Sequence, residues 1–161
     1  MTTSKNNRFS EQGFSLIELM IVIAIIGILI SVGVVGFKAA MRSGNEAATI
    51  DTLRNGIGAS QIQYALAHHG DFGTFDQLIA DHALDERYKG NTPVVNGYVF
   101  TMKVTPKSTT NQADFACNAD PQNSEGVSAT GRRHFYIDAA VSTVRENPDQ
   151  PATANDRPIG Q

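Results

Sequence analysis

The feature that most constrains this chain is an apolar run near the N-terminus, residues 14–37, FSLIELMIVIAIIGILISVGVVGF. The run holds 24 residues and a single charged side chain, Glu18, and the 19 residues from Leu19 to Phe37 carry no charge. As an α-helix, these uncharged residues extend roughly 28 Å, about the thickness of a bilayer's hydrocarbon core. Because soluble helices normally keep a polar face, the run predicts a membrane-spanning helix rather than a buried soluble one.

A polar segment, MTTSKNNRFSEQG, precedes the run and ends in Gly13. Its Lys5 and Arg8 favour a cytoplasmic N-terminus, although Lys38 and Arg42 beyond the run weaken that preference. A conventional secretory signal peptide is disfavoured, because its apolar stretch is only about 7–15 residues long. The sequence therefore predicts a single-pass segment with its N-terminus in the cytoplasm.

Residues 13–19, GFSLIEL, resemble the prepilin processing motif of type IV pilins and type II secretion pseudopilins, and the likeness continues through MIVIAIIGIL. The resemblance implies that a prepilin peptidase cleaves the chain between Gly13 and Phe14 and that the new Phe14 amine is N-methylated. It also implies an inner-membrane assembly platform and other pilin subunits as partners, with the lipid bilayer holding the chain before assembly. The subunit would end in a surface filament or a periplasmic pseudopilus.

Glu18 is the residue in the run that most needs an explanation. A carboxylate at membrane depth costs about 2.5–3.5 kcal/mol on insertion scales, and no Lys or Arg lies one helical turn away. In the family that the motif resembles, a Glu at this place pairs with the amine of the processed Phe, which implies an assembly role for Glu18. The alternative is a Glu held at the interface near the lipid head groups.

Beyond Phe37 the helix is expected to continue with one apolar face. Apolar residues recur at mostly three- or four-residue spacing at Ala47, Ile50, Leu53, Ile57 and Tyr64. This spacing is typical of an amphipathic helix, so one helix is predicted over residues 14–68, with Gly70 as its stop. Many family members carry a proline where this chain has Val35, so a kink there is less certain than in those proteins.

The rest of the chain predicts a small α+β head. Thr74 and Gln77 have capping-box spacing and predict a short helix over residues 75–82. Residues 85–96 read as a loop, and strands are predicted over 98–104, 115–119 and 134–138. The order of these pieces is similar to that of pilin-like proteins with three or four strands. The inward face is expected to place Tyr98 or Val99, Phe100, Phe135 and Ile137 against Ile50, Leu53, Ile57 and Tyr64.

The predicted fold class is thus α+β, a pilin-like ladle. Its long N-terminal helix has a transmembrane half and an amphipathic half, the latter packed on a small antiparallel sheet. The expected organisation is a leader peptide at 1–13, a transmembrane and assembly helix at 14–37, a globular head at 38–146 and a flexible tail at 147–161. The tail is predicted from its three prolines and few apolar residues.

Composition argues against several other functions. A net charge of −3 argues against a nucleic-acid binder, and one cysteine, Cys117, allows no intrachain disulfide. Cys117 is expected to be a small buried side chain, with an intermolecular disulfide as the weaker alternative. The four histidines are expected at the surface, and Arg132-Arg133-His134 reads as a solvated turn. Since no metal-ligand spacing or catalytic motif is visible, the chain is expected to be no enzyme and to need no cofactor or metal.

Three functions remain open on the sequence. The chain is a structural subunit of a type IV pilus-like filament, a pseudopilin of a type II secretion system, or an unprocessed single-span protein that displays a small binding domain. The motif at residues 13–19 argues against the third. The pilin is favoured over the pseudopilin because the sequence lacks the acidic calcium loop expected near the C-terminus of major pseudopilins.

Overall fold

The computed structural model describes residues 13–126, 128–140 and 143–160, so most of the predicted leader lies outside the described residues. The chain divides into two compact units at the step from Phe37 to Lys38. The first unit contributes a single apolar helix, and the second contains a helix-and-sheet head.

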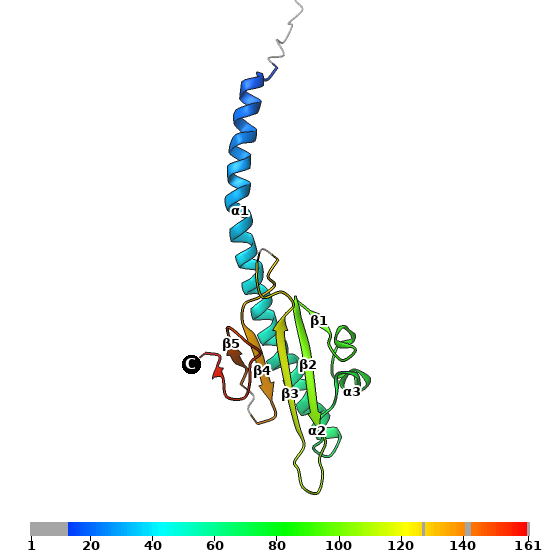
Figure 1. Ribbon diagram of the computed structural model, residues 1–161. Coiled ribbons are helices and arrows are strands. Elements are labelled where there is room, and N and C mark those ends of the chain that lie inside the picture. Colours follow the sequence, from blue (N-terminus) through cyan, green and yellow to red (C-terminus); the bar gives the residue numbers. More distant parts are fainter. Residues whose placement is uncertain (1–12, 127, 141–142, 161) are drawn as a thin grey trace, which may run out of the picture. The chain divides into compact units, whose positions relative to one another are not determined.

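The long helix begins with α1, Leu16–Asp51, and continues as a π-helical stretch η1, Thr52–Gly58, and as α2, Ala59–Ala67 (Figure 1). The helix predicted over 14–68 is therefore confirmed to within two residues at each end. It passes Val35 without a break, as expected where proline is absent. It ends where His69 and Gly70 adopt positive φ angles of 57° and 91°, the left-handed conformation that glycine accepts at a helix C-terminus.

Gly58 explains how the helix packs closely on the sheet in the head. A Cβ atom there would lie 3.1 Å from the Leu53 carbonyl oxygen and 3.3 Å from Ile137 Cδ1. Both distances are tight, and the first partner is backbone that cannot move easily. Glycine thus lets η1 approach β4, His134–Asp138, at a distance that a larger residue would increase.

Within the described residues, six antiparallel strands form one sheet in the order β1-β2-β3-β4-β5-β6. Their bounds are β1 Val94–Val95, β2 Tyr98–Thr105, β3 Asp114–Pro121, β4 His134–Asp138, β5 Arg145–Asn147 and β6 Arg157–Pro158. The three predicted strands are confirmed as β2, β3 and β4, which lie side by side in Figure 1. The sheet is larger than the three or four strands expected, because the very short β1, β5 and β6 carry too few residues for a recognisable alternation.

The sequence predicts a flexible tail at residues 147–161, but residues 147–160 of this segment pack against the head. β6 lies in this segment and pairs with β5, and Ala152 is 2% exposed. Polar contacts organise much of the segment, and Ile159 also packs against the core cluster. Asp156 accepts hydrogen bonds from the Thr153 backbone and from Asn147 at 2.7 and 2.8 Å, and Asn118 of β3 donates to the Ala152 carbonyl. A prediction based on apolar content could not see contacts of this kind.

The core forms where the amphipathic helix meets the inner face of the sheet. Leu53 and Ile57 are fully buried in one cluster with Phe100, Phe135 and Ile137. The predicted inward face is thus confirmed, and of the two alternatives at its start Tyr98 points inward, with no exposed surface. Ile50 packs against this cluster, whereas Tyr64 is buried but is not a member of it. Burying such side chains stabilises the fold by about 1.5–3 kcal/mol each.

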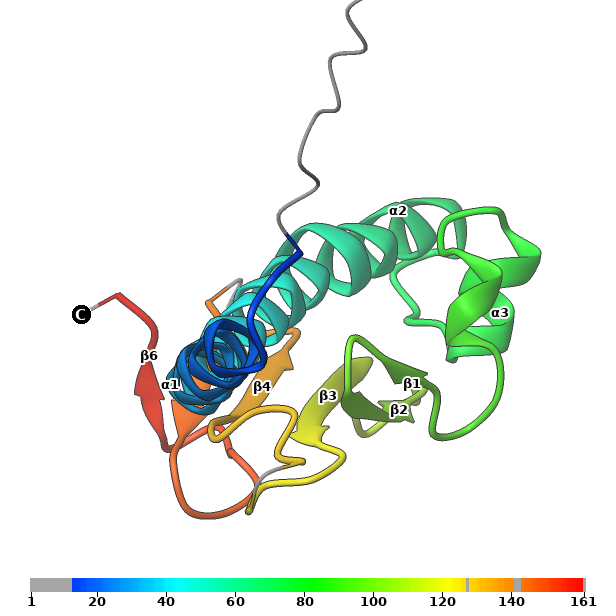
Figure 2. The same ribbon diagram turned by 90° about the horizontal axis from the view of Figure 1, so that it is seen from above.

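A short helix, α3, covers the end of α2 beside the sheet (Figure 2). It spans Phe75–Ala80, two residues shorter than predicted, and its Thr74–Gln77 capping box is present. His82, with φ at 55°, ends the turn after it. Gln61 is fully buried and bonds both the N–H and the carbonyl of Gly73, at 2.9 and 2.6 Å, which fixes the connection between α2 and α3.

A chain that begins at Lys38 is expected to be soluble and folded, because its core lies within residues 38–161. Circular dichroism and a cooperative urea transition check this expectation. A second chain that also lacks residues 98–138 serves as the control. It should aggregate, because Leu53 and Ile57 would lose the sheet that covers them. An unfolded 38–161 chain would contradict the assignment of an independent head.

Candidate functional site

The predicted processing position lies just before the long helix. Gly13, Phe14 and Ser15 belong to no helix or strand, and α1 begins at Leu16. Phe14 is 87% exposed, and nothing approaches within 4 Å of a Cβ atom placed on Gly13. The peptide bond between Gly13 and Phe14 is therefore exposed and non-helical, as a protease requires of the bond it cleaves.

Glu18 has a partner that sequence reasoning missed. Its Oε2 accepts a hydrogen bond from the Ser15 backbone N–H at 2.8 Å, and the Ser15 hydroxyl accepts one from the Glu18 N–H at 3.2 Å. This reciprocal pair is a capping box, and the Ser-x-x-Glu spacing in the sequence was the signal for it. The pair fixes the helix start and partly compensates the Glu18 carboxylate within its own chain.

The apolar helix of the first unit has no cover within the described residues. Its large apolar side chains are 45–77% exposed, with Leu16, Val32 and Val35 all above 70%. By length and composition this helix can cross a membrane. Lipid or the helices of other subunits would have to cover it, since an exposed patch this large is an interaction surface.

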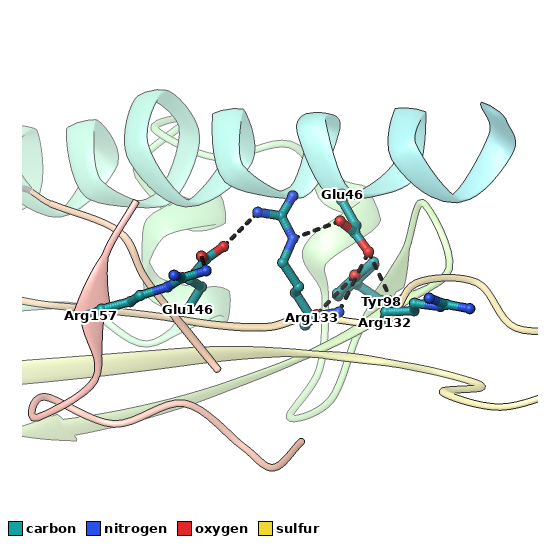
Figure 3. A network of polar contacts seen from close by, with 6 residues as sticks. All are labelled: Glu46, Tyr98, Arg132, Arg133, Glu146 and Arg157. Carbon is teal, nitrogen blue, oxygen red and sulfur yellow. Dashed lines mark hydrogen bonds and ion pairs between the residues drawn. The ribbon is translucent and has the colours of Figure 1, made fainter. Parts of the chain in front are cut away.

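The most developed polar site in the head joins the helix to the C-terminal strands (Figure 3). Arg133 Nε donates to Glu46 Oε2 at 2.8 Å, and Arg133 Nη1 donates to Glu146 Oε2 at 2.5 Å. Arg157 donates to the other oxygen of Glu146, also at 2.5 Å. The side chains of Glu46 and Glu146 are only 11% and 7% exposed, so both carboxylates depend on these partners.

Charge within this network is balanced, with two carboxylates against two guanidinium groups. Burial alone would raise the pKa of Glu146, but hydrogen bonds from Arg133 and Arg157 outweigh burial and hold that pKa below its ordinary value. Burial alone would likewise lower the pKa of Arg133, whereas its bonds to Glu46 and Glu146 raise it. Glu146 and Arg133 are therefore charged at neutral pH, and the network links α1, the start of β4, β5 and β6.

The same helix face also holds the loop between β3 and β4. Arg42 donates to the carbonyls of Ala129 and Gly126 at 3.2 and 2.9 Å, and Asn45 donates to the Thr130 carbonyl at 2.9 Å. Gly131 lies against Tyr98, whose hydroxyl leaves no room for a Cβ atom at residue 131. Residues 42, 45 and 46 thus anchor this loop from one side of the helix.

Two expectations for polar residues need correction. Arg133 is no solvated turn residue, because it is the centre of the buried network. His134 is not an isolated surface histidine either. Its side chain is 13% exposed, and its Nδ1 lies 2.6 Å from Asp120 Oδ1 on the neighbouring strand. Neither contact could be predicted, since each depends on which strands are neighbours.

Cys117 lies on β3 with no exposed surface, as predicted, and burial raises the pKa of its thiol. A protonated, buried thiol is unreactive. Among the described residues, no group of three or more His, Cys, Asp or Glu side chains is arranged to hold a metal ion.

Comparison with known protein families gives a match near the N-terminus. Residues 8–34 match the family model described as the prokaryotic N-terminal methylation motif. Neither the curated proteins nor the solved structures give a significant match to this chain. The matched residues contain Gly13, Phe14 and Glu18, and they support the resemblance to type IV pilins and pseudopilins. The motif indicates a structural subunit that is anchored in a membrane, processed by a prepilin peptidase and assembled with other subunits.

Proposed function

We propose that this protein is a structural subunit of a type IV pilus-like filament. Prepilin peptidase would cleave the chain after Gly13, and the N-terminus would lie in the cytoplasm while residues 14–37 cross the inner membrane. The assembly platform would then transfer the subunit into the filament, where the apolar helix exchanges lipid for neighbouring helices. The match of residues 8–34 to the N-terminal methylation motif carries the proposal.

Two features of the head and helix agree with a subunit that moves from the membrane into a filament. The exposed apolar side chains of residues 14–37 need a cover that the described chain does not supply. Leaving that surface in water would cost about 25 cal/mol per Å² of apolar area, so a subunit that leaves the bilayer has to enter a helix bundle. Outside the bilayer, the head keeps its own core of helix and sheet residues.

A pseudopilin of a type II secretion system is the second candidate, since it would use the same motif and the same kind of helix. The pilin is preferred because acidic side chains of the C-terminal segment already have partners within the head. Glu146 pairs with Arg157, and Asp156 accepts hydrogen bonds from Thr153 and Asn147. In the described part of the chain this segment contains no cluster of acidic ligands suited to calcium. Sheared surface fibres that contain this chain would support the pilin, and their absence beside a dependent secretion defect would support the pseudopilin.

Gly13→Leu is expected to leave the precursor uncleaved in the membrane, because a bulky side chain beside the scissile bond obstructs the peptidase. Mass spectrometry of the membrane fraction measures the N-terminus of each form. Wild-type protein should begin at an N-methylated Phe14, whereas the variant should retain residues 1–13.

Lys5→Gln is a suitable control, since it changes the leader but not the cleaved bond, and it should be processed. Wild-type protein that retains residues 1–13 in cells with an active prepilin peptidase would refute the proposed function and favour the unprocessed single-span alternative.

A further inference from the structure

A pocket of about 430 Å³ in the head is lined by charged side chains of both signs. Arg42 of α1 and Arg132 before β4 contribute two positive charges, and Glu125 and Asp149 contribute two negative ones. In the described part of the chain, none of these four side chains takes part in an ion pair. The pocket thus presents opposite charges that do not cancel each other directly.

The two arginine side chains differ in the hydrogen bonds that they make within the head. Arg42 uses Nε and Nη2 to bond the Ala129 and Gly126 carbonyls, which fixes the guanidinium but leaves its charge without a carboxylate. Arg132 gives only its backbone N–H to Glu46, and Figure 3 shows its side chain pointing away from that network. A phosphate is the anion that guanidinium groups recognise best, through paired N–H donors.

The carboxylates make a simple anion a poor match for the whole pocket. The Asp149 backbone N–H donates to Asn147 Oδ1 at 3.0 Å, and Asp149 is one of the residues that line the pocket. Inorganic phosphate would satisfy the arginines and be repelled by Asp149 and Glu125. A ligand that carries a phosphate and an ammonium a few bonds apart would satisfy both sets of charges.

The position of Arg42 in the chain suggests where such a ligand comes from. Arg42 follows Phe37 by only five residues, so the chain keeps the two Cα atoms within about 17 Å of each other in any conformation. If residues 14–37 span the bilayer, as the proposed function requires, Arg42 lies within reach of the lipid head groups. We propose that this pocket binds the zwitterionic phosphoethanolamine head group of a membrane lipid, its phosphate at Arg42 and Arg132 and its ammonium at Asp149 and Glu125.

Lipid retention by the full-length protein tests this binding. The protein is reconstituted in vesicles with equal amounts of phosphatidylethanolamine, phosphatidylcholine and phosphatidylglycerol and then extracted into mild detergent, and native mass spectrometry identifies the lipids it keeps. We expect phosphatidylethanolamine to be enriched several-fold over the other two. Phosphatidylcholine has the same phosphate but a methylated ammonium without N–H donors, and phosphatidylglycerol has no ammonium.

Variants separate the two halves of the pocket. Arg132→Gln should reduce retention of all three lipids, because each contains the phosphate. Asp149→Asn should remove only the preference for phosphatidylethanolamine, and Asp149→Lys should shift the preference to phosphatidylglycerol. Arg87→Gln is the matched control, because Arg87 pairs with Asp85 at an exposed site elsewhere in the head, and it should retain lipids as wild type does. The gain of phosphatidylglycerol in Asp149→Lys cannot result from misfolding.

Retention in proportion to the vesicle composition would overturn the proposal, and so would a wild-type preference for phosphatidylglycerol that Asp149→Asn leaves unchanged. Flotation of the protein with the vesicles tests membrane insertion separately. Failure to float would contradict the proposed function itself, whereas flotation with unselective retention would contradict only the head-group site. Added inorganic phosphate should not displace the retained lipid, and displacement would indicate a site for free anions instead.

Discussion

Glu18→Ala should reduce filament yield at least tenfold while the protein is still inserted and cleaved. Removing the carboxylate abolishes an insertion cost of about 2.5–3.5 kcal/mol, so membrane levels should not fall. The cleaved bond is unchanged, so processed protein should accumulate. Assembly should fail if, as the resemblance to pilins implies, the Glu18 carboxylate pairs with the processed Phe14 amine, because that charge is gone. The measurement compares processed protein in membranes with filaments sheared from the same cells.

Glu18→Gln separates the capping role that the structure shows for this side chain from the charge-pairing role that the resemblance to pilins implies. Glutamine still accepts the Ser15 N–H bond of the capping box but carries no charge. If charge pairing drives assembly, Glu18→Gln should fail to form filaments as Glu18→Ala does, whereas Ser15→Ala should assemble with a helix start weakened by only about 1 kcal/mol. Normal filaments from Glu18→Gln would show that the carboxylate acts as a helix cap and not as a charge.

Glu146→Ala should lower the free energy of unfolding of the head by about 2–3 kcal/mol. Breaking a fully buried ion pair costs about 3–5 kcal/mol, but Arg133 is 36% exposed and keeps Glu46, which reduces the loss. Urea unfolding of the 38–161 chain measures the change. Arg157→Gln should cost less than about 1 kcal/mol, because Arg157 is 72% exposed and water can replace its partner.

The Glu146 carboxylate should also make the stability of the head depend on pH. Because the folded pKa of Glu146 lies below its ordinary value near 4.5, the network stabilises the head above that pH and loses this contribution as pH falls toward the folded pKa. Wild-type stability should therefore decline below about pH 4.5, and Glu146→Gln should show a shallower decline. Equal declines in the two proteins, or a loss below about 0.5 kcal/mol in Glu146→Ala, would mean that the network contributes little.

Local patterns predicted the parts of the fold that local chemistry decides. The extent of the long helix followed from its apolar residues and Gly70, α3 from the Thr74 capping box, and the inner face of β2 and β4 from aromatic and β-branched residues. The helix cap at Ser15 could also be predicted from the Ser-x-x-Glu spacing, but Glu18 was interpreted only as a charged group.

Contacts between distant segments could not be predicted in the same way. Glu46 and Arg133 are 87 residues apart, and Arg133 reaches Glu146 only because β4 and β5 are neighbours in the sheet. Residues 147–161 were predicted to be a tail because their described part is held largely by ion pairs and backbone-directed hydrogen bonds, which leave no periodic apolar signal.

The C-terminal strand is fastened to the head by charge and not by a covalent bond. The single cysteine, Cys117, is buried on β3 and forms no disulfide. The chain therefore folds without an oxidant or a disulfide-forming enzyme, and reducing agents have no disulfide bond to break. Acid can break the ion pairs instead, since protonation of Glu146 removes the negative charge that holds both Arg133 and Arg157. A fibre built from such heads would tolerate changes in redox conditions, and acid would loosen the C-terminal strand of every subunit that it reaches.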